Sequence, residues 1–179
     1  MPYEPPPEIA GLSLAELAEQ VAARKLPPVD SWSPAETGES HMAIAADGSW
    51  THEGSVIARP AMVRAFASLL MCDAAGRHWL VTPTQRLSVE VADAAFIATD
   101  MTEKDGALAF RLNTDEIVIA GPDNPLVARG DAETPALYLA VRHGCEARLN
   151  RSTYEQLALA ADDAWRVASR GESYSLVPA

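Results

Sequence analysis

Thiols, glycine-rich loops and metal-ligand motifs are scarce in this chain of 179 residues. The two cysteines, Cys72 and Cys145, are too few for a disulfide framework, and we expect both to be reduced and packed as small apolar side chains. The ten glycines form neither a GxxxxGK[ST] loop nor a GxGxxG loop, which excludes P-loop and Rossmann nucleotide sites. The four histidines show no HxH or HxxxH spacing, and the cysteines form no CxxC. We therefore expect no metal and no cofactor.

Basic residues are also in short supply. Fourteen Lys and Arg stand against 25 Asp and Glu, giving a net charge of −11. This charge repels phosphate backbones and anionic lipid, so we expect neither a nucleic-acid polymer nor a membrane as partner. No run reaches the roughly 18 apolar residues that a spanning helix needs, and the first residues lack the basic and apolar regions of a secretory leader. We expect a cytoplasmic protein.

What the chain does contain is ordinary globular material, with 48% hydrophobic and 22% charged residues. Changes in proline content and turn signals divide it into three parts. Residues 1–40 are expected to form an extended arm and a helix, residues 41–100 a first α+β lobe, and residues 101–179 a second β-rich lobe with a C-terminal helix.

Three helices are predicted from start signals and apolar spacing. Ser13 begins a capping box, Pro60 opens a helix over residues 60–72, and a second capping-box spacing opens a long helix over residues 152–171. Alternating apolar residues and turn dipeptides predict strands near residues 56–58, 79–82, 87–91, 95–99, 107–112, 116–120, 125–128, 137–142 and 145–149.

The two halves of the chain look alike. A shift of 58 positions sets residues 80–81 beside 138–139 and residues 87–91 beside 145–149, and each hairpin follows a shorter one that ends at residues 56–58 or 126–128. The helix at 60–72 has no counterpart. We predict an α+β fold of two related β-rich lobes, produced by internal duplication, with a seam near residues 99–115 that suits a small ligand. Any two amphipathic hairpins can align in this way, which is the alternative.

Three arginines are candidates for binding an anion, because a planar guanidinium group binds phosphate or carboxylate bidentately. Arg59 precedes a helix N-terminus that favours anions, Arg86 follows a turn, and Arg142 ends a strand. The alternative is three separate surface arginines that pair with acidic neighbours. Trp50 could stack a base or belong to the core, and His52 could act as a base or only line a hairpin. The remaining candidate ligand-binding residues are Trp50, His52, Thr82 and Asn113.

The chain resembles a known bacterial family at several ordered segments. They are DGSWTHEGSVIAR at 47–59, LVTP at 80–83, ADAAF at 92–96, FRLNTDE at 110–116, NPL at 124–126, LAVR at 139–142 and the stretch from Glu146 to Tyr154. Together they are similar to the bacterial domain of unknown function 1285 over about residues 40–160. The resemblance implies a duplicated α+β core and a C-terminal lobe superficially similar to pleckstrin-homology-like barrels. It also implies a nucleotide-like ligand between the lobes and a signalling role. His41, His52 and Gln85 depart from the family's usual pattern.

The leading hypothesis is a non-enzymatic binding module. It would hold an anionic small molecule, with nucleotides among the candidates, and pass the change to a partner protein. One alternative is an interaction scaffold in which the lobe interface is only packed core. Another is an unrecognised hydrolase, since a catalytic triad assembles only in the fold, although no Gly-x-Ser-x-Gly elbow is present.

Overall fold

The computed structural model describes residues 9–179, and the chain divides into two units. The N-terminal unit holds residues 25–96 and 142–145, and the C-terminal unit holds residues 9–24, 97–141 and 146–179. Most of the predicted N-terminal arm, residues 1–8, lies outside the described residues.

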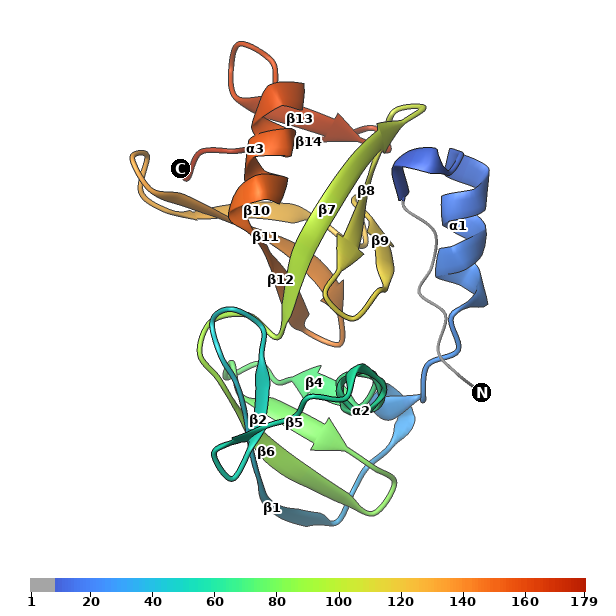
Figure 1. The fold of residues 1–179 in the computed structure, drawn as a ribbon, viewed down its shortest axis with the longest axis vertical. Coiled ribbons are helices and arrows are strands. Elements are labelled where there is room, and N and C mark those ends of the chain that lie inside the picture. The colour runs from blue at the N-terminus through green and yellow to red at the C-terminus, as the bar shows by residue number, and fades with distance from the viewer. Residues whose placement is uncertain (1–8) are drawn as a thin grey trace. The chain divides into compact units, whose positions relative to one another are not determined.

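The N-terminal unit is built on a six-stranded sheet in the order β3-β2-β1-β6-β5-β4 (Figure 1). Its elements are η2 (Val29–Ser31), β1 (Glu36–Ile44), β2 (Trp50–His52), β3 (Ser55–Val56), α2 (Pro60–Ala67), β4 (Leu70–Cys72), β5 (His78–Val81) and β6 (Gln85–Val91). β1 and β6 are parallel, whereas the other neighbours are antiparallel.

Strand alternation gives this sheet two different faces. Ile44 and Trp50 are paired across β1 and β2, and both are buried together with Ala67 of α2. On the other face, Val29 packs with Trp79 and Val81. Successive side chains of a strand point to opposite faces of the sheet, so β5 contributes apolar side chains to both covered faces.

Helix α2 is shorter than predicted. It begins at Pro60 as expected but ends at Ala67, and the apolar residues beyond it form strand β4, in which Leu70 pairs with Leu80. The helical spacing was misleading here because an apolar run also satisfies a strand that is buried on both faces. The predicted helix over 60–72 is therefore wrong for residues 68–72.

The C-terminal unit contains a second six-stranded sheet in the order β10-β11-β12-β7-β8-β9 (Figure 1). Its elements are η1 (Ile9–Gly11), α1 (Leu14–Ala23), β7 (Phe96–Lys104), β8 (Ala107–Leu112), β9 (Ile117–Ile119), β10 (Leu126–Gly130), β11 (Pro135–Arg142), β12 (Cys145–Leu149), α3 (Arg151–Ala160), β13 (Arg166–Ser169) and β14 (Glu172–Ser175).

Helix α1 packs on the β8–β9 hairpin of this unit. The predicted capping box is confirmed, since Ser13 Oγ accepts from the Glu16 N–H at 3.1 Å. Leu17 is fully buried in a cluster with Ala107 and Ile119. A ten-residue helix is only marginally stable alone, so this packing is what maintains α1.

The predicted long C-terminal helix is also too long. α3 ends at Ala160, and the carboxylate of Asp162 then accepts from the N–H groups of Ala164 and Arg166 at 2.9 Å each. This turn leads into the β13–β14 hairpin, whose Val167 and Tyr174 are buried. The side chain of Asp162 offers the backbone a local turn in place of another helical turn.

The two sheets have the same strand order. Read as β4-β5-β6-β1-β2-β3, the first matches β10-β11-β12-β7-β8-β9 strand for strand. This correspondence is what two related β-rich lobes predict, although it aligns β10 with β4 and not with the predicted residues 56–58. Within the described residues, no helix lies between β9 and β10 where α2 lies between β3 and β4.

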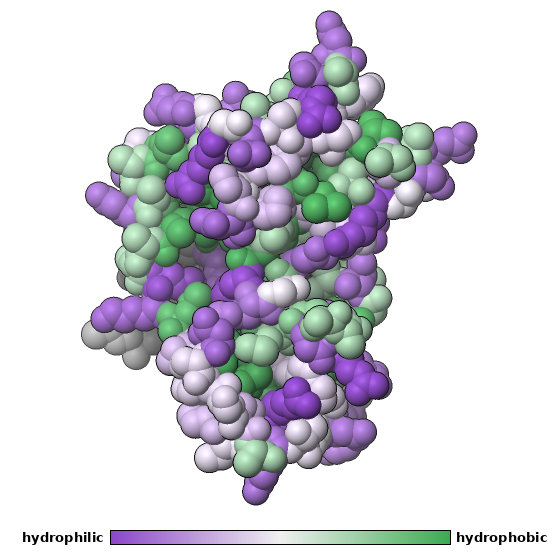
Figure 2. Space-filling model, turned by 180° about the vertical axis from the view of Figure 1, so that it is seen from behind, coloured by the Kyte–Doolittle hydropathy of each residue, from purple (hydrophilic) through white to green (hydrophobic). Residues whose placement is uncertain are grey.

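None of the helices in residues 9–179 is long and apolar enough to cross a bilayer. Hydrophobic residues on the face shown in Figure 2 lie among hydrophilic ones.

Candidate functional site

A groove in the N-terminal unit lies between the β1–β3 strands and helix α2, and we call it the α2 groove. Its volume is about 560 Å³. Six of the residues that line it are apolar, namely Met42, Val56, Ile57, Ala58, Met62 and Phe66. The polar lining residues are His52, Ser55 and Arg59. An apolar cavity of a few hundred cubic ångströms with few polar groups is typical of small-molecule sites.

Phe66 connects the groove to the core beneath it. Its ring stacks on Trp50 with centroids 6.3 Å apart and an interplanar angle of 19°. Trp50 is 1% exposed, and among residues 9–179 its indole Nε1 has no hydrogen-bond partner. The wall that Phe66 provides is therefore backed by a buried aromatic ring.

Arg59 stands where the chain enters α2. It occupies the N-cap position in an extended conformation, and its side chain makes no capping hydrogen bond. Pro60 follows at the first helical position, where its missing N–H costs nothing. Arg59 is exposed and is one of the three polar residues that line the groove.

The opposite face of the same strands carries an acidic depression. Register and alternation place Ala43, Thr51 and Glu90 on this face, whereas Met42 and His52 lie on the other. The depression has a volume of about 470 Å³, and Glu39, Glu53 and Glu90 are among its lining residues.

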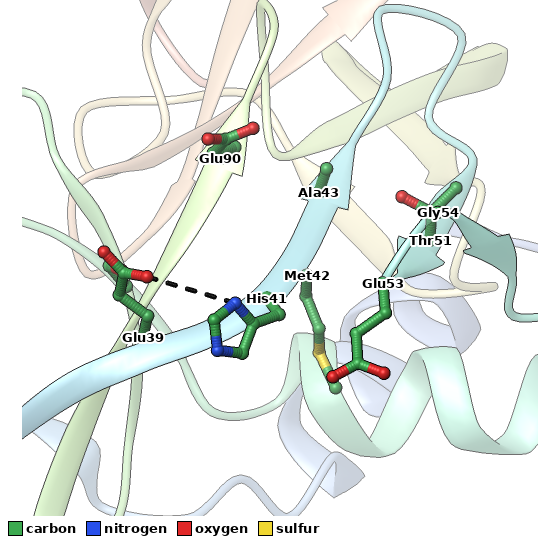
Figure 3. Close-up of a pocket in the computed structure, with 9 residues that line it drawn as sticks. Glu39, His41, Met42, Ala43, Thr51, Glu53, Gly54 and Glu90 are labelled. Atoms are coloured by element: carbon green, nitrogen blue, oxygen red, sulfur yellow. Dashed lines mark ion pairs between the residues drawn. The ribbon is translucent and has the colours of Figure 1, made fainter.

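Figure 3 shows His41 and Glu39 turned toward each other in this depression, with 3.9 Å between Nδ1 and Oε2. His41 adopts a left-handed backbone at a bulge between Glu39 and Met42. No group of three or more His, Cys, Asp or Glu side chains within residues 9–179 is placed to hold a metal ion. The depression contributes negative potential and would disfavour an anion on this face.

The other two candidate arginines serve in packing. The guanidinium of Arg86 lies 4.2 Å from the ring centroid of Trp79, and its Nε donates to Thr37 Oγ1 at 3.2 Å. That of Arg142 lies 5.1 Å from the ring centroid of Phe96, and its Nη2 donates to the Ala67 carbonyl at 3.1 Å. Arg142 thus contacts the C-terminal end of α2, whereas Arg59 precedes its N-terminal end. Within residues 9–179, Arg86 and Arg142 thus lie against different aromatic rings, Trp79 and Phe96.

The remaining candidates fall in three places. His52 lines the α2 groove, and Trp50 lies in the core below it. Thr82 Oγ1 bonds the backbone of Gln85 across the β5–β6 turn. Asn113 belongs to the C-terminal unit, where its Oδ1 accepts from the Ile97 N–H at 3.1 Å.

Sequence reasoning did not select Met42, Val56, Met62 or Phe66 as site residues. Phe66 also packs on the buried Trp50, as a core residue does. Met62 lies on α2 and remains 42% exposed, and Val56 lies in β3 and remains 68% exposed. Large apolar residues that stay exposed next to one another mark binding surfaces.

Comparison with known families covers both halves of the chain. The model described as "Domain of unknown function (DUF1285), N-terminal domain" matches residues 27–94, and "Protein of unknown function (DUF1285), C-terminal domain" matches residues 95–176. The chain belongs to the DUF1285 family. The boundary between the two matches falls near residue 96, where the N-terminal unit passes into the C-terminal one.

Two solved DUF1285 structures are similar to the chain. One is a protein from Silicibacter pomeroyi DSS-3, with 34% identity and a TM-score of 0.78 over 90% of this chain and 94% of that one. The other is from Shewanella baltica OS155, with 22% identity and a TM-score of 0.52 over 64% of this chain and 87% of that one. At that identity the second shows the fold alone. No curated protein matches the chain.

Proposed function

We propose that this DUF1285 protein is a non-enzymatic binding module that holds an anionic small molecule with an apolar body in the α2 groove. The observation that carries the proposal is Arg59, an exposed arginine that lines a groove with six apolar residues, in a chain with net charge −11. A cation that remains exposed beside apolar side chains gives both the charge and the contact area that such a ligand needs.

The same proposal includes the location of the protein and its role in signalling. We place the protein in the cytoplasm, where ligand binding would be passed to a partner protein in signal transduction. A pleckstrin-homology-like C-terminal lobe, which the family resemblance implies, is part of the same proposal and would suit such a role. A nucleotide-like ligand at the seam between the lobes stays a separate prediction, which rests on the family resemblance.

The test is a thermal-stability screen of the full chain against anionic, neutral and cationic small molecules. A ligand that binds only the folded state raises the apparent Tm by mass action. We expect anions with apolar bodies to raise Tm and the Arg59→Gln variant to lose the effect. Arg77→Gln is the matched control, because Arg77 is an exposed arginine of the same unit that does not line the groove. No shift with any anion would overturn the proposal.

A protein-interaction scaffold is the second candidate function. The exposure of Val56 and Met62 favours it, because exposed apolar groups also bind protein surfaces. Native mass spectrometry of the purified chain distinguishes the two functions, since a scaffold retains a protein partner and a binding module retains a small molecule. The hydrolase alternative has no comparable observation in its favour.

A further inference from the structure

The donors at the α2 groove are few, and their number limits the charge of the ligand. Arg59 is the single Arg or Lys among the described residues that line it, and His52 supplies the other nitrogen-bearing side chain. A di- or triphosphate carries several negative charges and is normally held by several cations or by a row of backbone N–H groups. One guanidinium matches one negative charge.

Helix α2 does not make up for the missing cations. Pro60 has no N–H, and the N–H groups of Met62 and Val63 already donate to the Arg59 carbonyl at 3.0 and 3.2 Å. Phosphate sites at helix N-termini depend on N–H groups that are free to point at the ligand. The first turn of α2 is therefore a poor phosphate site.

The other candidate arginines are engaged away from the groove. Arg86 lies on Trp79 and bonds Thr37, and Arg142 bonds the Ala67 carbonyl. Drawing either guanidinium to the groove would break these contacts. The acidic depression on the opposite face of the strands adds negative potential, which disfavours a polyanion more than a monoanion.

The apolar part of the groove calls for a matching apolar body. Met42 and Met62 are flexible side chains that adapt to irregular shapes, and Phe66 provides a flat wall backed by Trp50. Covering Met62, which is 42% exposed, would remove apolar surface from water, and this favours binding.

From these contacts we infer, on the basis of the function proposed above, that the ligand is a small monocarboxylic acid with an aliphatic or aromatic body. Its carboxylate binds the guanidinium of Arg59, which presents two parallel N–H donors in a geometry that a carboxylate matches. Its body lies against Met42, Met62 and Phe66. The site therefore selects against nucleotides by charge and against alcohols and amines of the same shape by the guanidinium.

The experiment is calorimetry on the full chain with ligands that share one body. The probes are 4-phenylbutyrate, 4-phenylbutanol and 4-phenylbutylamine, together with octanoate, AMP and ATP. We expect the two carboxylates to bind at least tenfold more tightly than the alcohol, the amine and both nucleotides. Arg59→Gln should lower carboxylate affinity at least tenfold, Arg59→Lys should lower it less, and Arg77→Gln should leave it unchanged. Met62→Ser should weaken both carboxylates and the alcohol.

Three other outcomes would contradict, in turn, the ligand class, the role of Arg59 and the proposed function. If AMP or ATP binds through Arg59 and the carboxylates do not, the ligand class inferred here is wrong and the proposed anion-binding function stands. If the carboxylates bind equally well to Arg59→Gln, the assignment of the carboxylate to Arg59 is wrong. If no probe binds and the broader screen shows no Tm shift, the proposed function itself falls.

Discussion

The backbone N–H of Cys72 donates to the carbonyl oxygen of His143 at 2.9 Å. Cys72 lies in β4, an edge strand, and His143 lies in the two-residue turn between β11 and β12. Edge strands present unpaired N–H groups, and this bond satisfies one of them. His143 and Gly144 both have left-handed backbones, with φ of 49° and 77°, which is the type I′ pattern of tight hairpins. The turn is therefore shaped to fit against β4.

This fit predicts that Gly144→Ala is destabilising. A Cβ at Gly144 would collide with the carbonyl oxygen of Cys72, and alanine also resists the positive φ. We expect the free energy of unfolding to fall by about 2–4 kcal/mol in urea titrations. Gly76→Ala is the matched control, because Gly76 has a φ of 82° but nothing within 4 Å of its Cβ. Equal losses in the two variants would show that the contact with Cys72 is unimportant.

We predict that Arg142 stabilises the fold through the planar shape of its guanidinium group as well as through its charge. Arg142→Lys keeps the charge but replaces the planar guanidinium group that lies over Phe96 and donates to the Ala67 carbonyl. We expect the midpoint of urea unfolding to fall, corresponding to about 1–2 kcal/mol. Arg151→Lys, at a side chain that is 93% exposed, should change stability by no more than about 0.5 kcal/mol. A lysine variant of Arg142 as stable as the parent would contradict this role.

The sequence predicted where α1 and α2 begin better than where helices end, whereas the predicted capping box at Ser152 is wrong because Asn150 caps α3. The start of α1 depends on Ser13 and Glu16, and that of α2 on Pro60, which are signals within one turn of chain. The end of α2 depends on Leu70 pairing with Leu80, and no local residue marks it. Tertiary pairing of this kind overrides local spacing, because an apolar run fits either a buried strand or a helix.

The candidate site shows the same division between local and tertiary information. Residue type identified Arg59 and His52 as possible ligand contacts, and both line one groove. Residue type could not show that Arg86 would lie on Trp79 or that Arg142 would reach the Ala67 carbonyl, since those partners come from other strands and from α2. The apolar lining of the groove was missed because it comes from β1, β3, α2 and the segment before α2, and the sequence does not show that these segments lie together.

The ion pair between Arg24 and Glu116 is predicted to hold the end of α1 on the C-terminal unit. Arg24 Nε lies 2.5 Å from Glu116 Oε1, the Glu116 side chain is 2% exposed, and Thr114 donates to its other oxygen. Arg24→Gln removes a cation that pairs with a buried carboxylate, so we expect a loss of about 3 kcal/mol in urea unfolding. The exposed pair Arg151–Glu155 is the control, and Arg151→Gln should cost about 0.5 kcal/mol or less. Similar losses at both sites would contradict the prediction.

We predict that the Asp73 carboxylate stabilises the folded state at neutral pH and that this contribution is lost in acid. The indole N–H of Trp79 donates to Asp73 Oδ2 at 3.0 Å, and this bond, followed by the Arg77 backbone N–H, lowers the pKa of the carboxyl below its ordinary value. Because the folded pKa lies below the unfolded one, the stabilisation is complete above about pH 4 and disappears as pH falls through the folded pKa. Trp79→Phe removes the largest cause, so NMR titration of the Asp73 carboxyl should give a higher pKa in that variant. Asp73→Asn should lower stability at pH 7 more than at pH 3. An unchanged titration in Trp79→Phe would assign the shift to the backbone donors alone.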